Sequence, residues 1–203
     1  MRGTVLATCL ALLTACSPPV AQGADGGPDS GRREVAVFAG GCFWSIEKHF
    51  DEMPGVISAV SGFAGGRAAN PSYEQVVRGG TGHVEAVRVT FDPERVSYRR
   101  LVDSFWRDID PTDASGQFCD RGDQYRTAVF VTPGQRAVAQ ASRQAAQRRL
   151  GQRRIVTPIR ASARFWPAEA YHQDFARRNP ARYNAYRLGC RRDARLRAVW
   201  GRS

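Results

Sequence analysis

The sequence predicts an α+β fold, one domain in which helices pack on a mixed central sheet. Three observations support this prediction. The chain has 203 residues and 42% of them are apolar, which suits a single core of ordinary size. Segments with the period of a β-strand are interspersed with amphipathic helical segments, but without the strict repeat of a parallel α/β protein. Glycine and proline residues separate these segments and mark turns.

Strand and helix patterns alternate through the first half of the domain. Residues 84–91 alternate between apolar and polar side chains, as in a core strand, and Asp92-Pro93 ends the pattern. Ser97 is placed to cap a helix whose apolar stripe runs from Leu101 to Ile109. On the same grounds we expect strands at 35–38, 56–63 and 84–91, and helices at 42–53, 72–77 and 97–109.

A polar segment without periodicity, residues 110–124, follows the last of these helices. Loops of this length inside a compact domain tend to carry function. Beyond the loop the patterns resume, and the helix expected at 134–150 has only small apolar residues, so we expect it at the surface. In this half we expect strands at 125–131 and 155–161, and helices at 134–150, 168–178 and 193–200.

The first 33 residues are predicted to lie outside the folded domain. Arg2 precedes an apolar run from Val5 to Ala15, which is too short to cross a bilayer but has the length of an export signal. The segment ends in Leu13-Thr14-Ala15-Cys16, which resembles a bacterial lipobox, whose cysteine becomes a lipid-carrying N-terminus. A plain cleaved signal with an incidental Cys16 is the alternative.

The residues after Cys16 are rich in proline, glycine, serine and aspartate, so they cannot bury apolar surface and are typical of a tether. We therefore expect a lipoprotein-type signal peptide (1–15), a flexible tether (16–33) with lipidation at Cys16, and a folded domain (34–203). The expected location is the cell envelope, periplasmic or otherwise extracytoplasmic, with the protein held at a membrane by its lipid.

The formal net charge of +11 does not indicate a nucleic-acid-binding protein. Lys48 is the only lysine, and the arginines are spread over the C-terminal two-thirds of the chain instead of forming one block. A basic composition alone is only an electrostatic footprint. Metal binding is also disfavoured, because the chain has no Cys-x-x-Cys or His-x-x-x-His pair and its three histidines are far apart in sequence.

Cys42 is the strongest candidate for a reactive residue. It follows the glycine pair Gly40-Gly41 and begins the helix expected at 42–53, so it lies where a strand gives way to a helix N-terminus. Unpaired N–H groups and the helix dipole favour negative charge there, which predicts a thiolate near neutral pH. Phe43 and Trp44 follow directly, and an apolar wall beside a reactive sulfur suggests a pocket for a small, mostly apolar group. The bland alternative is a buried structural cysteine.

Four further residues become candidates only if they face the same pocket. Glu85 begins a strand and would by default face solvent, but burial would raise its pKa and make it a general acid. Tyr73 and Tyr125 would by default be surface tyrosines, although their hydroxyls could instead donate hydrogen bonds to an oxygen. Asp120, in the long polar loop, is by default a turn residue.

The cysteine count indicates at least one free thiol. Cys9 lies in the signal segment and Cys16 is the lipidation candidate, which leaves Cys42, Cys119 and Cys190 in the domain. Three is an odd number, so they cannot all pair with one another. A papain-like protease is disfavoured because a phenylalanine separates Cys42 from its tryptophan, and a thiol peroxidase because no proline or arginine adjoins Cys42.

Taken together, the motifs resemble those of the A-type peptide-methionine (S)-S-oxide reductases. They occur in the order found in that family, cover residues 35 to about 190, and include Gly41-Cys42-Phe43-Trp44 and Gly82-His83-Val84-Glu85. The matching segments are 40–44, 54–56, 62–66, 70–73, 82–87, 91–93, 120–126 and 168–174. For the fold, the resemblance implies a two-layer α/β sandwich with a ferredoxin-like core.

The resemblance also implies a role for each candidate. Cys42 would attack the sulfoxide sulfur, and Phe43 with Trp44 would hold the substrate methyl group. Glu85 would protonate the sulfoxide oxygen, Tyr73 and Tyr125 would donate hydrogen bonds to it, and Asp120 would shape the site. The resemblance requires no cofactor.

After the attack Cys42 would be a sulfenic acid, which a second thiol converts to a disulfide. We expect Cys190 as that resolving cysteine, with Cys119 as the alternative, and a thioredoxin-like dithiol as the external reductant. The expected substrates are free or protein-bound methionine-S-sulfoxide, and the expected state is a monomer. A different hypothesis is an exported lipoprotein that binds oxidised peptides without turnover, although binding alone needs no nucleophile.

Overall fold

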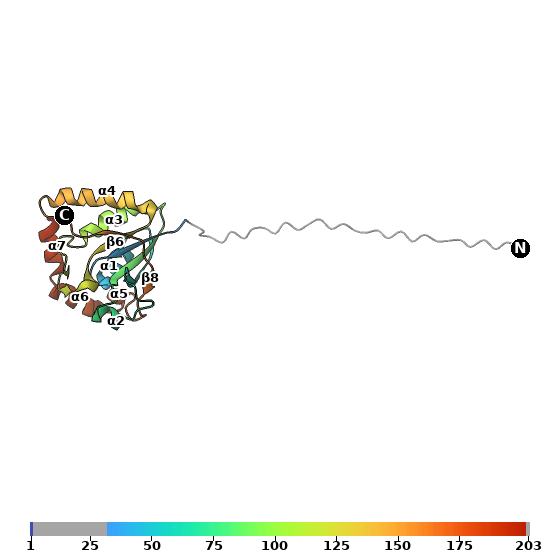
Figure 1. Cartoon of the computed structure of the whole chain (residues 1–203), viewed down its shortest axis with the longest axis horizontal. Coiled ribbons are helices and arrows are strands. Elements are labelled where there is room, and N and C mark those ends of the chain that lie inside the picture. The colour runs from blue at the N-terminus through green and yellow to red at the C-terminus, as the bar shows by residue number, and fades with distance from the viewer. Residues whose placement is uncertain (2–31, 202–203) are drawn as a thin grey trace. The chain divides into compact units, whose positions relative to one another are not determined.

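The computed structural model describes Met1 and residues 32–201, and the described domain is built on one six-stranded sheet (Figure 1). Cys16, the signal segment after Met1 and nearly all of the tether lie outside the described residues. The strand order is β7-β6-β1-β3-β2-β8, antiparallel throughout except for the parallel pair β6 and β7. The strands are β1 (Glu34–Ala39), β2 (Val56–Ala64), β3 (Val84–Phe91), β6 (Ala128–Val131), β7 (Ile159–Ala161) and β8 (Phe165–Pro167).

The order of elements explains how the sheet is wound. Apart from the short α2, β4, β5 and η1 between them, β1, α1, β2, β3, α3 and β6 occur in the order β-α-β-β-α-β. The four strands lie in the order β6-β1-β3-β2. This is the split β-α-β arrangement of a ferredoxin-like core. β7 and β8 extend the two edges of that core. The α+β fold with a mixed sheet is therefore confirmed.

Helices cover one face of the sheet over an aromatic core. Phe38 of β1 stacks on Phe50 of α1 and on Phe105 of α3, with ring centroids 4.8 and 5.0 Å apart. α4 packs against α3, where the Trp106 indole donates a hydrogen bond to Ser142 (Figure 1). The helices are α1 (Phe43–Asp51), α2 (Tyr73–Arg78), α3 (Tyr98–Arg107), α4 (Pro133–Leu150), α5 (Phe175–Arg178), α6 (Pro180–Gly189) and α7 (Arg192–Trp200).

Several predicted elements differ from the structure, mostly in the second half. The polar loop contains a small hairpin of β4 (Gly116–Gln117) and β5 (Asp120–Arg121), then a 3₁₀ turn, η1 (Asp123–Tyr125). The strand predicted to start at residue 125 therefore starts at Ala128, and the one predicted at 155–161 forms only at Ile159–Ala161. β8 and α6 were not predicted at all.

The helix predicted at 168–178 is helical only in α5, and residues 168–174 form turns instead. Gln173 explains this, because its side chain bonds to both backbone groups of Ser61 in β2 and to the Ala168 carbonyl. These tertiary hydrogen bonds override the local helical preference.

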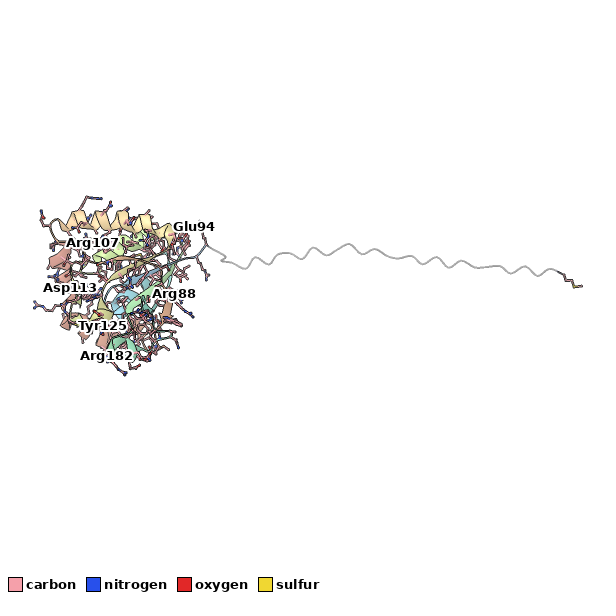
Figure 2. The ribbon with its side chains drawn as sticks, in the orientation of Figure 1. Arg88, Glu94, Arg107, Asp113, Tyr125 and Arg182 are labelled. Carbon is pink, nitrogen blue, oxygen red and sulfur yellow. A yellow bond between two sulfur atoms is a disulfide. The ribbon has the colours of Figure 1, made fainter. Side chains whose placement is uncertain are left out.

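Two observations concern surfaces of the described residues. No described helix is both long enough and apolar enough to cross a membrane. Figure 2 shows Arg107, Arg88 and Arg182 near the top, the right and the bottom of the domain, so these three arginines do not belong to one basic patch.

Candidate active site

Cys42 is the N-cap residue of α1, three residues after the end of β1, as predicted. Gly41 precedes it with φ +83°, and a Cβ at Gly41 would lie 2.5 Å from Cβ of Gln117, so the turn requires glycine. Only 7% of Cys42 is exposed. The Phe43 amide, at the start of the helix, donates a 2.9 Å hydrogen bond to Glu85 Oε2. The Glu85 carboxyl, on β3, is thus held at the helix N-terminus beside Cys42.

The predicted thiolate at Cys42 is wrong for the substrate-free protein. Burial raises the pKa of the Cys42 thiol well above its usual value, and the neighbouring carboxyls of Glu85 and Asp120 raise it further. Hydrogen bonding from Tyr186 and from the Trp44 amide lowers that pKa without outweighing the other causes. The helix N-terminus is present, but desolvation and like charge dominate. Cys42 therefore rests as a neutral thiol.

Glu85 is buried near Cys42 and does not face solvent. Its exposed fraction is 2%, and burial raises its pKa to about 8, with a smaller contribution from Asp120. The hydrogen bond from the Phe43 amide lowers the pKa but does not reverse the shift. Glu85 is consequently a mostly neutral carboxylic acid at pH 7, able to donate a proton.

Both candidate tyrosines lie near Glu85 and Cys42. Tyr73 is the first residue of α2, and its amide donates a 2.9 Å hydrogen bond to Glu169. Burial, and then the nearby Glu85, raises the pKa of Tyr73 to about 12, and the same two causes raise the pKa of Tyr125. Tyr125 ends the 3₁₀ turn η1 instead of beginning a strand. Their hydroxyls therefore remain protonated donors.

Phe43 and Trp44 form the predicted apolar wall. Phe43 is almost fully buried between Phe63 and Tyr73, with ring centroids 5.9 and 6.3 Å away. Trp44 is half-buried and stacks flat on Phe175, with centroids 3.7 Å apart and an interplanar angle of 8°. The stack on Phe175 therefore helps to hold the Trp44 indole in place.

Three residues at the site were missed in the sequence. His172 accepts a 3.2 Å hydrogen bond from the Trp44 indole at Nδ1, Phe175 supports the same indole, and Tyr186 lies edge-on to it. His172 and Phe175 lie in or beside the segment 168–174, whose motif could have marked them. Tyr186 lies on α6, for which we had predicted no element, so nothing in the sequence pointed to it.

Asp120 lies near Cys42 and Glu85 and links them to the other two cysteines of the domain. Its carboxylate accepts a 2.5 Å hydrogen bond from the Tyr186 hydroxyl, and burial raises its pKa. Cys119, the residue that precedes Asp120, is exposed and forms a disulfide with Cys190 at the end of α6. The structure therefore pairs the expected resolving cysteine, Cys190, with Cys119 and leaves Cys42 as the free thiol among the described residues.

Cys119, Asp120 and Cys190 are the one group of potential metal ligands in the described part of the chain. Side-chain atoms of Cys119, Asp120 and Cys190 lie within 4.8 Å of one another. The two sulfur atoms are bonded to each other, however, and metal ligation requires thiolates. In this state the group offers a redox pair and not a metal site.

Comparisons with known proteins agree with this geometry. The family model for peptide methionine sulfoxide reductase matches residues 34–203. "Peptide methionine sulfoxide reductase MsrA 2" of Caulobacter vibrioides is 48% identical over 197 residues, which are 97% of this chain and 96% of that protein. A second protein with the same name, from Rhizobium meliloti, is 53% identical over 83% of this chain and 84% of its own length.

Solved structures give the same result for the fold. The methionine sulfoxide reductase A of Corynebacterium diphtheriae is 33% identical, with a TM-score of 0.67 over 75% of this chain and 77% of that one. Reduced Mxr1 of Saccharomyces cerevisiae is 28% identical, with a TM-score of 0.68 over 75% of this chain and 88% of that one. With the family model covering the whole folded domain, the chain belongs to the peptide methionine sulfoxide reductases, the enzymes that reduce oxidised methionine back to methionine.

Proposed function

We propose that the domain reduces methionine-S-sulfoxide, free or in proteins, with Cys42 as nucleophile and Glu85 as general acid. The observation that carries this proposal is the buried, neutral Glu85 carboxyl at the helix N-terminus that holds Cys42. A sulfoxide oxygen is a poor leaving group until it is protonated, and a neutral acid at this place supplies the proton. Tyr73 and Tyr125 donate hydrogen bonds to the same oxygen and stabilise its developing charge.

The reaction balances without a cofactor. Cys42 attacks the sulfoxide sulfur, the S–O bond breaks, and the oxygen ends on Cys42 as a sulfenic acid while methionine leaves. The sulfoxide sulfur is reduced by two electrons and the Cys42 sulfur is oxidised by two. Phe43 and Trp44 hold the substrate methyl group, because the wall they form is the apolar surface next to the nucleophile.

Cys119 and Cys190 form the pair that restores Cys42. One of these thiols condenses with the sulfenic acid, which releases water and forms a disulfide with Cys42. The other thiol then attacks that disulfide, which frees Cys42 and leaves the Cys119–Cys190 bond seen in the structure. Cys119 is exposed whereas Cys42 is buried, so an external dithiol reaches the Cys119–Cys190 disulfide more readily than it would reach a disulfide of Cys42.

The external reductant in this proposal is a thioredoxin-like protein. One solved structure of similar fold is described as yeast Mxr1 in complex with Trx2. That yeast protein is 20% identical to this chain, so the likeness concerns the fold, and the reductant is carried over here as part of the proposal.

One experiment tests the chemistry and the recycling together. The reduced protein is mixed with methionine-S-sulfoxide without reductant; methionine is counted and the disulfide is mapped by mass spectrometry. With one equivalent of sulfoxide per protein, we expect one methionine and a Cys119–Cys190 bond with Cys42 free; excess sulfoxide should react with the restored Cys42 and add a second methionine. Cys119→Ser and Cys190→Ser should each still form one methionine, but trap Cys42 in a disulfide with the remaining cysteine. Cys42→Ser should form none, and methionine formation by that variant would refute the proposal.

The location proposed for the enzyme is the cell envelope, with a lipid on Cys16. The support is the sequence of residues 1–16, an export-type apolar segment that ends in Leu13-Thr14-Ala15-Cys16. The test is cell fractionation of the full chain beside Cys16→Ser. We expect the full chain with the membranes and the variant in the soluble extracytoplasmic fraction. Equal fractionation of the two would contradict lipid anchoring.

A further inference from the structure

The segment between Asp123 and Glu169 is the longest part of the chain without an acidic residue. It contains nine arginines, from Arg126 to Arg164. The reaction proposed above gives none of these arginines a role. Their positions in the structure decide whether they are scattered charges or parts of one site.

Three of these arginines line one groove. It lies between α4 and the segment that follows α4, and its volume is about 750 Å³. Arg143, Arg148 and Arg154 line it, together with three glutamines of α4 and Ile155. None of the described residues that line the groove is acidic or aromatic. The groove is therefore cationic and rich in amides, without a negative charge of its own.

The segment after α4 is fixed against the helix. The Gln147 amide donates a hydrogen bond to the Arg153 carbonyl at 2.9 Å, and its oxygen accepts the Ile155 amide at 2.9 Å. Arg143 donates to the Ile155 carbonyl at 2.9 Å. These hydrogen bonds hold the backbone on both sides of Arg154, so both walls of the groove are in place before a ligand binds.

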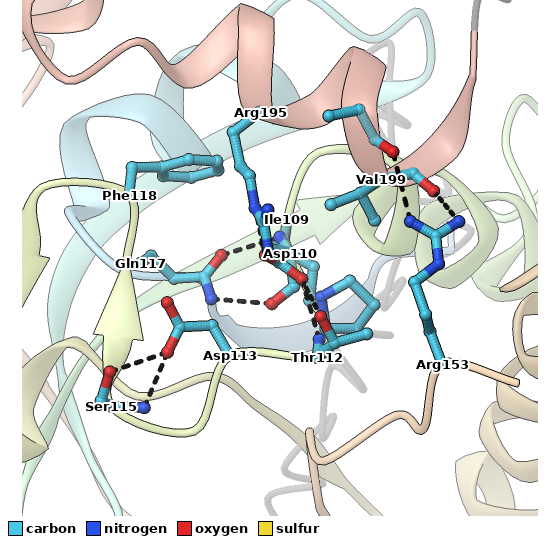
Figure 3. A network of polar contacts seen from close by, with 12 residues as sticks. Ile109, Asp110, Thr112, Asp113, Ser115, Gln117, Phe118, Arg153, Arg195 and Val199 are labelled. Carbon is cyan, nitrogen blue, oxygen red and sulfur yellow. Dashed lines mark hydrogen bonds and ion pairs between the residues drawn. The ribbon is translucent and has the colours of Figure 1, made fainter.

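The arginines of the groove keep donors for a ligand. Within the part of the chain that the structure describes, no acidic side chain pairs with Arg143, Arg148 or Arg154, and Nε of Arg143 is buried without a partner. Arg153 differs, because its guanidinium donates to the Val199 carbonyl at 2.6 Å (Figure 3). A guanidinium is a planar fork of donors that matches phosphate oxygens, so the groove suits a ligand that carries phosphate.

The helix α4 also lies beside the part of the chain that leads to Cys16. Gln135, in the first turn of α4, donates a 2.7 Å hydrogen bond to the Val35 carbonyl near the start of β1. The flexible tether predicted for residues 16–33 has a root-mean-square span of about 25 Å. The 18 residues of α4 span about 27 Å. A bilayer that holds a lipid on Cys16 is therefore within reach of the groove.

The candidate active site lies on another side of the domain. Figure 1 shows α4 along the top, whereas α2, α5 and α6 lie toward the bottom. These three helices carry Tyr73, Phe175 and Tyr186. A surface that contacts α4 consequently leaves the side that carries the site open to protein partners.

Lipid headgroups fit this groove better than a nucleic acid does. Both present phosphates, but a single-stranded nucleic acid is usually bound with its bases stacked on aromatic side chains, and no described lining residue is aromatic. The predicted export signal also directs the domain to the cell envelope, where a membrane is the anionic surface at hand.

We propose that this groove binds the phosphate groups of anionic lipid headgroups and holds the domain on the membrane in one orientation, with α4 against the bilayer and the active site turned away from it. The proposal rests on the proposed location, because the lipid on Cys16 brings the groove to the bilayer. Each arginine near an anionic surface strengthens binding about fivefold, and the attraction reaches only about one Debye length, roughly 10 Å.

The lipid and the groove have different tasks in this arrangement. Three arginines are too few to keep a chain without lipid on a membrane at physiological salt, so Cys16→Ser is still expected in the soluble fraction. Once the lipid holds the domain at the bilayer, the local concentration of headgroups is high, and the same arginines suffice to orient it.

Vesicle binding without the lipid tests the groove by itself. The protein is the processed chain, residues 16–203 with Cys16→Ser, which retains every described helix and strand. Sedimentation compares vesicles of phosphatidylcholine alone with vesicles that contain about one-third phosphatidylglycerol. At low salt we expect binding to the anionic vesicles only, and a steep loss toward physiological salt. Replacing Arg148 and Arg154 together by Gln should weaken this binding by about 10- to 30-fold.

The matched control replaces Arg67 and Arg78 by Gln. Both are exposed, the same charge is lost, and Arg78 ends α2, far from α4 in Figure 1. Vesicle binding should stay within about twofold of the parent, and single-turnover methionine formation by Arg148→Gln/Arg154→Gln should be unchanged. Equal weakening by the two double variants would overturn the proposal, since net charge and not the groove would then set the binding. Tighter binding of a duplex oligonucleotide than of anionic vesicles, lost with Arg148 and Arg154, would overturn it in favour of a nucleic acid.

Hydrogen exchange of the lipidated chain separates orientation from anchoring. The chain is reconstituted on both kinds of vesicle, and exchange is followed by mass spectrometry. On anionic vesicles we expect slower exchange at residues 148–155 and unchanged exchange in α6; on neutral vesicles both segments should exchange as in solution. A chain that remains on anionic vesicles without slower exchange at residues 148–155 would overturn the inference. Failure to remain on either kind of vesicle would instead count against the lipid on Cys16.

Discussion

The buried surroundings of Cys42 and the disulfide of Cys119 with Cys190 are built on opposite physical principles. The first is desolvated: Cys42, Glu85 and Phe43 have exposed fractions of 7%, 2% and 1%. The second lies on an open loop and a helix end, with Cys119 exposed. Proton donation by a carboxyl requires burial, since burial raises its pKa, whereas disulfide exchange requires access for a partner thiolate.

The two regions are also held in place differently. Packed aromatic rings fix the first, as in the stack of Trp44 on Phe175. Polar contacts to α7 fix the second. Figure 3 shows Arg195 of α7 bonding to Asp110, while the Gln117 side chain closes on the Asp110 backbone at 2.9 and 2.8 Å. Arg192 adds a buried pair with Asp108, with N and O atoms 2.8 Å apart. Each half of the catalytic cycle therefore takes place where its chemistry is favoured: sulfoxide reduction in a buried site and disulfide exchange at an accessible one.

The largest expected effect is at the desolvated acid. Glu85→Gln keeps an acceptor for the Phe43 amide but has no acidic proton, so the fold should persist while the single-turnover rate falls by about 10²- to 10⁴-fold. The measurement is methionine formed by reduced protein without added reductant. Thiol–disulfide exchange at Cys119–Cys190, followed with dithiothreitol, should be unchanged. If the single-turnover rate of Glu85→Gln fell by less than about tenfold, a residue other than Glu85 would be the proton donor.

The pH dependence sharpens the same contrast. Burial raises the pKa of Glu85 to about 8, so the active form is protonated and is lost as pH rises through that value. The single-turnover kcat/KM should therefore fall about tenfold per pH unit above pH 8, since this ratio reports groups of the free enzyme. Glu85→Gln should lack this fall. An activity that rises steadily from pH 7 to pH 9 in the parent would contradict a neutral Glu85 as acid.

A smaller effect is expected where the two regions meet. Tyr186→Phe removes the hydroxyl that donates to Asp120 but keeps the ring beside Trp44. The half-buried Asp120 carboxylate loses a hydrogen bond, and the free energy of unfolding should fall by about 1–3 kcal/mol. Urea denaturation measures this, and the Asp120→Asn variant and the double variant show whether the two residues are coupled. Additive losses would mean that the hydrogen bond contributes nothing of its own.

The smallest effect is expected in the polar scaffold. Arg195→Ala removes an ion pair in which the arginine side chain is 53% exposed and the Asp110 side chain 2% exposed. Solvent screens the arginine, and the buried carboxylate keeps its two hydrogen bonds from Thr112, so we expect the free energy of unfolding to fall by about 1 kcal/mol. Recycling by a protein dithiol should slow slightly, and the single-turnover rate should not change. Arg99→Ala, which breaks an exposed pair on α3, is the matched control and should leave recycling unaffected. Equal slowing by both variants would remove the link between the α7 contacts and recycling.

The sequence predicted the desolvated region better than the open one, and the reason is physical. Cys42, Phe43 and Trp44 follow a strand directly and begin an amphipathic helix, so local periodicity placed them correctly. The link between Cys119 and Cys190 spans 71 residues, and sequence alone does not give the pairing of cysteines. The turn at 168–174 was predicted as helix because its side chains favour one, but its hydrogen bonds to β2 and α2 decide its conformation.

The pKa of Cys42 shows a further limit. A helix N-terminus is visible in the sequence and predicts a lowered pKa. The depth of burial and the approach of Glu85 and Asp120 depend on β3 and on the polar hairpin, and both raise the pKa. Tertiary environment outweighed the local signal, so the predicted position of Cys42 at the helix N-terminus was correct, while the predicted charge of its thiol was wrong.

The neutral state of Cys42 also determines how fast small oxidants react with it. Hydrogen peroxide oxidises thiolates far faster than thiols, and a reactive cysteine in an oxidising surrounding is open to irreversible over-oxidation. A thiol that stays protonated at neutral pH and only 7% exposed reacts slowly with a small diffusing oxidant. The Cys42 thiol is thereby protected from over-oxidation while no substrate is bound, and in the proposed mechanism it reacts only beside a bound sulfoxide.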